Sequence, residues 1–504
     1  MRSWLLFFSL LILIPLRGWA IDPPKVEVRA VWLTTYSGLD WPRFPATGST
    51  SRKAQQADLC EKLDRLAEAN FNTIFIQARI RGDVMYKSSY ERMSAVFSGV
   101  EGRWPGYDPL RFVIQECHKR GMECHAWFVT FPLGSVRNVR AQGKHSVVSQ
   151  HRSLCLPFKS QWYLNPGLPA TSDYLTTLVR ELVATYDIDG IHFDYIRYPD
   201  KVISFPDYSS YRRYGKGLKR DEWRRQNLNR LMARFYDEVK KIKPWVQVSC
   251  ASLGKYHRLV EMPDVGWTAY ESVCQDPAQW LAKGKLDMVV PMMYYRYTNY
   301  FPFLDDWVRH ANGRLIVSGL GAYRMDEQEG DWALNDVTDQ MDYQRYHGGS
   351  GSAFFRCQYV LNSPKKFYQE LKESYYPYPA LLPPLKWLNQ DRPVSPGPIQ
   401  VIEKDAELIL TWTPSAEAST KRVTYNLYGT HTDSVDFNSP KDLLLQGILD
   451  TSVVLSIDTN QVQTFTFAVT ASSRYHMESL PDTCTFYQYL PAVFRRLPDR
   501  MVFK

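Results

Sequence analysis

The 504-residue chain has only one long apolar run, and this run lies at its start. Arg2 precedes an almost unbroken apolar stretch over 5–16, and Gly18-Trp19-Ala20 follows it as a small-x-small sequence. This arrangement is typical of a secretory signal peptide, which we expect at 1–20 with cleavage near Ala20. The run is too short for a comfortable membrane span, so no transmembrane segment is expected in the mature chain. The sequence predicts an exported protein, either periplasmic or secreted.

The chain also lacks the spacings that most metal and cofactor sites require. Its eight cysteines include no C-x-x-C pair, and its histidines show no zinc-ligand spacing, although His125 and His192 lie near other candidate residues. No G-x-S-x-G nucleophile elbow and no Walker loop is present. These absences disfavour serine esterases, metal-dependent deacylases and nucleotide-binding enzymes. We therefore expect neither a metal nor a cofactor.

Neither positively nor negatively charged residues are concentrated in one part of the sequence. The formal net charge of +8 is spread along the chain without the basic cluster typical of a nucleic-acid-binding protein, so no nucleic-acid partner is expected. Aromatic residues, by contrast, are abundant at 14% of the chain. Their flat rings suit the apolar faces of sugars, but they also fill protein cores, and composition alone leaves both interpretations open. It also leaves the oligomeric state open.

Short β-branched or apolar runs alternate with longer amphipathic stretches over 26–376. Eight runs are predicted strands: 29–34, 73–78, 123–129, 190–194, 246–251, 287–292, 315–319 and 352–355. Strands separated by helices pair in parallel, and eight of them fit a closed (β/α)8 TIM barrel, an α/β fold. A doubly wound open sheet is the alternative, but no glycine-rich phosphate turn follows the first strand.

The pattern changes after the barrel region. Residues 377–398 are rich in proline and predict a stiff linker. Short alternating strands follow, at 399–403, 407–412, 424–430, 452–456 and 464–471. With Trp412 and nearby tyrosines as core residues, the region 399–490 resembles a small all-β fibronectin type III sandwich, followed by a tail at 491–504. We expect this domain to act as a spacer or docking module.

Catalytic residues of a barrel lie at the carboxyl ends of its strands and in the loops that follow. The fourth strand ends with His192-Phe193-Asp194, and Tyr195 and Arg197 come next. Alternation along the strand directs Asp194 into the barrel mouth, where burial of an acid requires a partner such as Arg197 or His192. A structural ion pair is the alternative, but the position favours catalysis.

Glycoside hydrolysis needs two carboxyl groups, one to protonate the leaving oxygen and one to activate water or attack carbon. Asp194 is the first candidate, and Glu271, in a loop among aromatic residues, is the second, although loop acids are often merely solvated. Asp276 is equally explained as a helix N-cap, and Asp40 as a turn residue beside Trp41. Arg79 contacts substrate or pairs with Asp83 or Asp194. The remaining substrate-binding candidates are Asp83, Trp127, Tyr294 and Tyr295.

Four ordered motifs resemble those of a bacterial family of exported glycosyl-hydrolase-like barrel proteins, long catalogued as a domain of unknown function. They are Arg29-Ala30-Val31-Trp32-Leu33-Thr34-Thr35 with Asp40-Trp41-Pro42, Gln77-Ala78-Arg79 with Gly82-Asp83-Val84-Met85-Tyr86, Asp189-Gly190-Ile191-His192-Phe193-Asp194-Tyr195-Ile196-Arg197-Tyr198-Pro199, and Gln275-Asp276 with Trp280 and Asp287 to Tyr294. Members with an assigned activity act on peptidoglycan glycan strands, so the resemblance implies that substrate class.

A more distant resemblance bears on mechanism. Residues 189–196 are similar to the chitinase motif Asp-Gly-x-Asp-x-Asp-x-Glu, but Ile196 replaces the terminal acid, and Met293-Tyr294 resembles a pair that chitinases use beside the N-acetyl group. The chitinase general acid is therefore missing, and Asp194 or another carboxyl must take its role. The sequence predicts a glycoside hydrolase acting on a wall or other polysaccharide. The alternative is a glycan-binding protein on a decayed barrel without catalysis.

Overall fold

The computed structural model describes residues 23–200, 202–262, 265–404, 407–419, 422–456, 465–481 and 486–487. The expected signal peptide at 1–20 and the tail at 491–504 lie outside the described residues. Within those described ranges, no helix combines the length and the apolar character that crossing a membrane requires.

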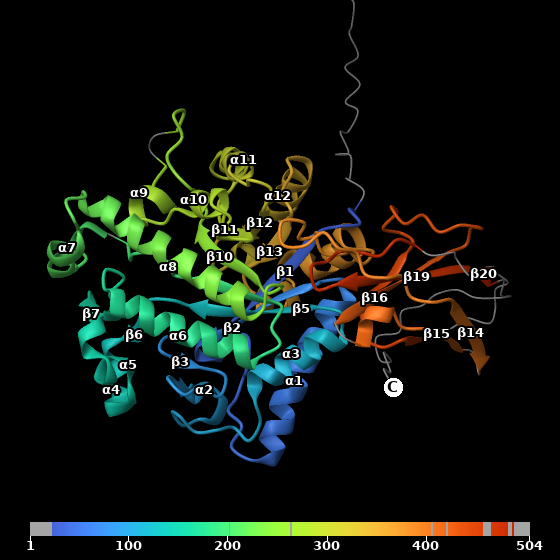
Figure 1. Cartoon of the computed structure of the whole chain (residues 1–504), viewed down its shortest axis with the longest axis horizontal. Coiled ribbons are helices and arrows are strands. Elements are labelled where there is room, and N and C mark those ends of the chain that lie inside the picture. Colours follow the sequence, from blue (N-terminus) through green and yellow to red (C-terminus); the bar gives the residue numbers. More distant parts are fainter. Residues whose placement is uncertain are drawn as a thin grey trace, which may run out of the picture.

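Eight parallel strands form the closed barrel that the sequence predicts (Figure 1). Around the barrel their order is β1-β2-β5-β9-β10-β11-β12-β13, and β13 pairs back to β1. Their bounds are β1 (Val28–Leu33), β2 (Thr73–Arg79), β5 (Glu123–Val129), β9 (Gly190–Asp194), β10 (Gln247–Leu253), β11 (Met288–Met292), β12 (Leu315–Leu320) and β13 (Gly351–Phe354). The eight predicted strands are confirmed to within about two residues at each end, the usual uncertainty of element boundaries.

Helices surround the barrel, and their starts follow local chemistry. Asp108 and Asp276 each accept a hydrogen bond from a backbone amide one turn into the helix they precede, and a proline follows each at the first helical position. The helices are α1 (Ser49–Glu68), α3 (Pro109–Lys119), α6 (Pro169–Thr185), α8 (Arg220–Ile242), α10 (Pro277–Ala282), α11 (Phe301–Arg309), α12 (Leu334–Tyr346), α13 (Cys357–Leu361) and α14 (Phe367–Glu370).

Side chains alternate across each barrel strand, which decides what faces the interior. In β1 and β2, Trp32 and Phe75 belong to the interior cluster, whereas the residues on either side of them pack outward against the helices. In β9, Ile191 and Phe193 pack outward. His192 and Asp194 therefore point inward, as the alternation predicts.

Insertions that the sequence pattern does not predict follow several strands at their carboxyl ends. They include a three-stranded sheet after β5 and short helices after β2, β9 and β10, and in Figure 1 α4, α5, α7 and α9 lie on the left of the barrel. The bounds are β3 (Asp83–Val84), β4 (Arg92–Met93), α2 (Ala95–Ser98), β6 (Pro132–Ser135), α4 (Val136–Gln142), α5 (Val147–Gln150), β7 (Cys155–Phe158), β8 (Gln161–Leu164), α7 (Tyr208–Tyr214) and α9 (Ala269–Val273).

The proline-rich segment is packed, not free. Leu381 exchanges backbone hydrogen bonds with Glu27 and Lys25, just before β1. Leu385 is fully buried in the interior cluster beside Val28 and Met288, which begin β1 and β11. The expected linker therefore closes the amino-terminal opening of the barrel.

The C-terminal region is an all-β domain of two sheets packed on a common core. Trp412 and Tyr425 contact each other in that core, with ring centroids 5.5 Å apart. One sheet contains β14 (Ile399–Lys404), β15 (Glu407–Trp412) and β18 (Ser452–Ser456), and the other β17 (Leu443–Ile448), β16 (Val423–Thr430), β19 (Phe465–Ser473) and β20 (Phe486–Tyr487). The sequence pattern predicts five of these strands and misses β17 and β20.

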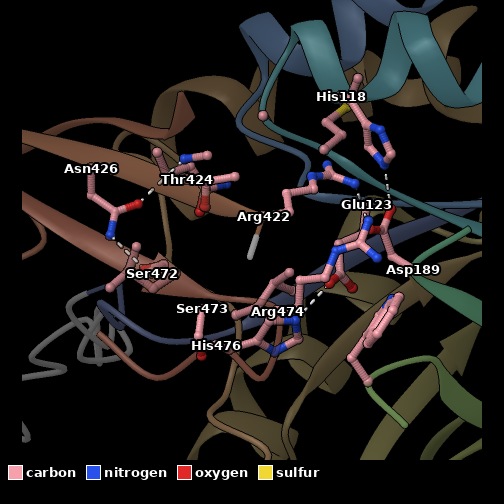
Figure 2. Close-up of a pocket in the computed structure, with 17 residues that line it drawn as sticks. His118, Glu123, Asp189, Arg422, Thr424, Asn426, Ser472, Ser473, Arg474 and His476 are labelled. Atoms are coloured by element: carbon pink, nitrogen blue, oxygen red, sulfur yellow. Dashed lines mark hydrogen bonds and ion pairs between the residues drawn. The ribbon is translucent and has the colours of Figure 1, made fainter. Parts of the chain in front are cut away.

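This domain docks on the amino-terminal face of the barrel, opposite the insertions (Figure 1). Figure 2 shows Arg422, Arg474 and His476 of the sandwich approaching the barrel acids Glu123 and Asp189 around a cavity of about 90 Å³. His476 Nε2 lies 2.6 Å from Glu123 Oε1, and Arg422 lies 3.6 Å from Asp189. The carboxyl ends of the strands, where catalytic residues are expected, stay clear of the sandwich.

Candidate active site

Asp194 ends β9 and is held by two hydrogen bonds. Its Oδ2 accepts from Trp127 Nε1 at 3.1 Å, across to the neighbouring strand β5, and its Oδ1 accepts from the Tyr195 amide at 2.7 Å. Tyr195 has a φ of 50°, a left-handed conformation uncommon outside glycine, and this turns the chain just after the strand. Asp194 is 5% exposed, and each of its oxygens keeps a second lone pair for another partner.

Burial is the main influence on the pKa of Asp194, which it raises above the ordinary aspartate value. Arg197, the Tyr195 amide, Trp127 and Arg81 act in the opposite direction without cancelling the effect of burial. An acid with a raised pKa keeps its proton to higher pH, which a general acid requires. Arg81, which the sequence reasoning misses, stands just beyond the end of β2 near the Arg79 motif.

Arg197 stands beside Asp194 with unused donors. Its side chain is 8% exposed, and neither Nε nor Nη1 has a hydrogen-bond partner among the described residues. Nη1 lies 3.9 Å from Asp200 Oδ1, and the guanidinium carbon lies 4.8 Å from the centre of the Tyr195 ring. Buried unpaired donors are costly, so an acceptor supplied by a ligand would stabilise this arrangement. Asp200 is a second acid that the sequence reasoning misses, although it directly follows the Asp194 motif.

Tyrosines surround the same position. Asp194 contributes to the raised pKa of Tyr294, whose ring lies 5.6 Å from that of Tyr323 and 5.8 Å from that of Phe355. Tyr295 lies next to Lys255, 4.7 Å from the ammonium to the ring centre. The structure therefore brings Trp127, Tyr195, Arg197 and Tyr294 together around Asp194.

His192 lies one layer deeper. Trp32 Nε1 donates to its Nε2 at 3.1 Å, its Nδ1 lies 2.9 Å from Ser249 Oγ, and its ring stacks on Phe75. Burial, with a smaller contribution from His125, holds the pKa of His192 well below its usual value. The imidazole is therefore neutral, with both nitrogens engaged, and it forms part of the barrel interior beneath Asp194 in place of the predicted substrate contact.

Arg79 is a buried structural residue, and its ion-pair partner is neither Asp83 nor Asp194. Its Nε and Nη2 donate to Glu91 at 2.7 and 2.6 Å, and its Nη1 donates to the carbonyls of Val129 and Thr130. Arg79 and Glu91 are both fully buried at the side chain. The expected substrate contact is replaced by this pair because every terminal nitrogen of the guanidinium already has a partner.

Asp40 and Trp41 are likewise interior. Asp40 pairs with Arg356 at 2.7 Å and accepts from the amides of Thr34 and Gln358, each at 2.8 Å, while burial raises its pKa. The Trp41 ring is fully buried, and its Nε1 donates to the Gln55 carbonyl. The turn-making interpretation of Asp40 is the one that these contacts favour, and Trp41 fills the core.

The other candidate acids have structural partners too. Asp83 is buried and accepts from the Arg81 amide at 2.9 Å, and burial raises its pKa. Asp276 caps α10 through the Gln279 amide and accepts from Tyr256 Oη at 2.7 Å. Glu271 is exposed in the first turn of α9, where its carboxylate accepts from Thr268 Oγ1 at 2.5 Å.

Several large apolar side chains remain exposed in loops that follow the carboxyl ends of strands. They include Leu39 after β1, Tyr90 and Trp104 after β2, Tyr195 after β9, Trp267 after β10 and Tyr297 after β11. Exposed rings on the face that carries Asp194 provide surfaces on which sugar rings can stack.

Comparisons with known proteins identify the family of the chain. The sequence model of the family described as glycosyl hydrolase-like 10 matches residues 27–320, from β1 to β12. The chain is 28% identical over 477 residues to the glycosyl hydrolase YngK of Bacillus subtilis (strain 168), covering 90% of this chain and 92% of YngK. It is 32% identical over 372 residues to the glycosyl hydrolase DigH of Escherichia coli (strain K12), covering 67% of this chain and 84% of DigH.

Proposed function

The chain belongs to the glycosyl hydrolase-like 10 family and is a glycoside hydrolase, and from this premise we propose that it cleaves peptidoglycan glycan strands outside the cytoplasm, with Asp194 as its general acid. The observation that carries the proposal is the position of Asp194. It is a buried carboxyl with a raised pKa, at the carboxyl end of a barrel strand and flanked by two arginines and several aromatic rings.

In the proposed reaction, protonated Asp194 donates its proton to the glycosidic oxygen as the bond to the anomeric carbon breaks. A second carboxylate then assists water or attacks that carbon. Asp200 is our first candidate, because Arg197 links it to the surroundings of Asp194. Glu271, the second carboxyl predicted from the sequence, is the alternative. Its hydrogen bonds with Thr268 and with the Arg258 amide, however, also fit a structural role at the start of α9.

The cations near Asp194 support the proposed substrate class. Arg197 offers unpartnered N–H groups, and Arg81 contributes to the same electrostatic environment. Two guanidinium groups favour a glycan that carries carboxylate or amide oxygens over a neutral one. Peptidoglycan glycan strands have such groups, and the family resemblance and the expected signal peptide support the same choice.

The test is to incubate the protein with purified peptidoglycan stripped of its stem peptides, with chitin and with plant glycans, and to identify products by mass spectrometry. We expect soluble fragments from peptidoglycan, and a loss of about 10²–10⁴-fold in rate for Asp194→Asn, the usual contribution of a general acid. Asp194→Asn should keep its fold and bind glycan. Equal turnover by Asp194→Asn, or binding by the wild-type protein without any product, would contradict the proposal.

Asp200→Asn and Glu271→Gln form a matched pair that identifies the second carboxylate. We expect Asp200→Asn to lose turnover and Glu271→Gln to keep it, and the reverse result would assign the role to Glu271. Analysis of the anomeric configuration of the first product by NMR then distinguishes retention from inversion.

We also propose domain boundaries at 26–376 for the barrel and 399–490 for the sandwich. The strand orders β14-β15-β18 and β17-β16-β19-β20 support a fibronectin type III-like assignment. The docking of this domain on the face away from Asp194 supports a positioning role without catalysis.

A further inference from the structure

We propose that His257, Asp306 and His310 form a binding site for a divalent transition metal, with zinc as the metal that this set suits best. One ligand atom from each residue lies within 4.8 Å of the others. His257 lies in the loop between β10 and α9, Asp306 lies in α11, and His310 immediately follows α11. The inference does not depend on the proposed substrate or on Asp194.

The spacing of His257 and Asp306 matches a coordination shell. His257 Nε2 lies 3.3 Å from Asp306 Oδ1. Two ligands at about 2.0–2.1 Å from a tetrahedral zinc ion are separated by about 3.3 Å, since the edge of a tetrahedron exceeds its centre-to-corner distance by roughly 1.6-fold. His310 stands beside the same carboxylate oxygen, and its Nδ1, which faces the Asp306 carbonyl, lies 3.5 Å from that oxygen.

Other histidine–carboxylate pairs in the described residues are much closer. The separations are 2.7 Å for His118–Asp189, 2.9 Å for His125–Glu123, 2.9 Å for His347–Asp305 and 2.6 Å for His476–Glu123. Those are distances of charge-assisted hydrogen bonds. The His257–Asp306 separation of 3.3 Å is longer than these, and His310 directs its Nδ1 to the Asp306 carbonyl, at 2.7 Å, in place of the carboxylate. Neither imidazole therefore forms a short charge-assisted hydrogen bond with the Asp306 carboxylate.

The tautomers also favour metal binding. Nδ1 of His257 lies 2.8 Å from the Arg258 carbonyl, and Nδ1 of His310 lies 2.7 Å from the Asp306 carbonyl. A carbonyl oxygen only accepts, so each Nδ1 carries the proton and each Nε2 keeps its lone pair. Metal-binding histidines commonly donate their other ring N–H to a carbonyl in this way, which fixes the orientation of the ring.

Asp306 is the buried member of the site. The residue is 2% exposed, and its Oδ2 has no hydrogen-bond partner among the described residues. The cation Arg309 approaches Asp306 Oδ1 at 3.4 Å, but its side chain is 65% exposed and is free to turn into solvent. A metal ion would supply the compensation that this buried carboxylate lacks.

The surrounding residues hold the imidazoles in place and leave access from solvent. The Tyr256 ring contacts the rings of His257, His310 and Trp307, at centroid separations of 5.0, 5.1 and 5.5 Å. The two histidines are about one-third exposed at the side chain. Two imidazoles and one carboxylate leave a fourth position for water, an arrangement that zinc accepts. The bound metal would tie the loop after β10 to α11.

Sequence spacing alone does not reveal this site. Asp306 and His310 are four residues apart on one helical turn, but His257 comes from a distant loop, and only the fold brings it to them. The sequence predicts no metal because its histidines lack zinc-ligand spacing. A site whose ligands come from both a loop and a helix does not show that spacing.

The experiment is calorimetric titration of ZnCl₂ into the tag-free full-length protein after removal of metals with EDTA. We expect about one zinc ion bound per chain, and binding at least ~10-fold weaker in His257→Ala and in Asp306→Asn, since even an outer-sphere partner typically contributes 10–100-fold to affinity. The matched control is Asp305→Asn on the neighbouring residue, whose carboxylate pairs with His347; this variant should bind zinc like the wild type.

Two further measurements keep the result unambiguous. Zinc should raise the melting temperature of the wild-type protein and of Asp305→Asn but not that of His257→Ala, and a bound Co²⁺ ion should give the absorption of a four-coordinate centre. Stoichiometric zinc binding that survives in both His257→Ala and Asp306→Asn would overturn the proposal. Failure of the wild-type protein to bind zinc would overturn it too, whatever its activity on glycans.

Discussion

At the residue scale, Asp194 shows which properties of a proposed catalytic acid can be predicted from a sequence. Its strand, the alternation that turns it inward and its aromatic neighbours were predictable, because they follow from local pattern. The partners of Arg79 and Asp40 were not predictable, because Glu91 and Arg356 come from other segments whose approach only the fold determines. Whether a charged residue near a strand end has a catalytic or a structural role can therefore be decided only when its partners are known.

The raised pKa of Asp194 predicts a basic limb in the profile of kcat/KM against pH. A general acid is active when protonated, so kcat/KM should fall as pH rises through the pKa of Asp194, at a pH above the ordinary aspartate range near 3.9. The measurement is kcat/KM against pH on soluble glycan fragments. A profile that stays flat over the whole alkaline range would mean that another group donates the proton.

The variant Arg197→Met tests two proposed effects of Arg197, which are substrate recognition and the lowering of the pKa of Asp194. Removal of a charge-assisted hydrogen bond to substrate costs about 1.5–3 kcal/mol, so kcat/KM on a carboxylate-bearing glycan should fall about 10- to 150-fold, mainly through KM. Because Arg197 lowers the pKa of Asp194, the basic limb should also move to higher pH.

The control for Arg197→Met is a neutral chitin oligomer, on which the KM of wild type and variant should differ little. An equal loss on acidic and neutral glycans, with an unmoved basic limb, would reduce Arg197 to a structural residue.

At the element scale, the strands with regular apolar periodicity could be predicted from the sequence, whereas the irregular insertions could not. All eight barrel strands carry apolar runs long enough to recognise, and β9 and β5 agree with their predicted bounds at both ends. The short strands β6, β7 and β8 and the edge strand β17 have mixed burial and little alternation, so their sequences resemble loops. The loops at the carboxyl ends of the barrel strands were therefore the least predictable part of the fold.

Gly190 tests how closely the barrel interior is packed. A Cβ atom on Gly190 would collide with the His125 imidazole, which occupies the space opposite it in β5. Gly190→Ala should therefore lower the free energy of unfolding by about 1–3 kcal/mol, the usual cost of overpacking. Denaturant unfolding monitored by tryptophan fluorescence measures this change.

Gly48→Ala serves as the control for this prediction, because a Cβ there meets nothing within 4 Å. It should cost only a few tenths of a kcal/mol to about 1 kcal/mol, as the change falls at a helix N-cap. In a His125→Ala background the penalty at Gly190 should shrink, since the two side chains compete for one space. Strictly additive penalties would show that His125 is not the obstacle.

At the scale of the whole molecule, the two domains are joined by charges that meet on the face opposite the active site. His476 of the sandwich approaches Glu123 (Figure 2) and donates to it and to the Pro383 carbonyl. Arg422 and Arg474 pair with Asp187. The same interface includes the linker that closes the barrel. The proposed active site and the domain interface therefore lie at opposite ends of the barrel, and each should respond separately to mutation.

The His476–Glu123 pair makes this docking depend on pH. His476 lies close to Glu123, which lowers the pKa of Glu123 to about 2 and raises that of His476. The stabilisation from Glu123 is complete above its unfolded pKa near 4.5 and is lost as pH falls toward about 2. The stabilisation from His476 is complete below 6.5 and is lost as pH rises through its raised pKa. Docking should therefore be tightest between about pH 4.5 and 6.5.

His476→Asn separates this interaction from the rest of the interface. Asparagine tolerates the left-handed backbone at this position, where φ is 58°, but it does not titrate. The variant should lose on the order of 3 kcal/mol because the buried pair is broken, and its stability should no longer fall above pH 6.5 as that of the wild type does. Calorimetry across pH, with limited proteolysis at the linker, measures both effects. If wild type and His476→Asn lose stability in parallel above pH 6.5, the alkaline transition belongs to another group.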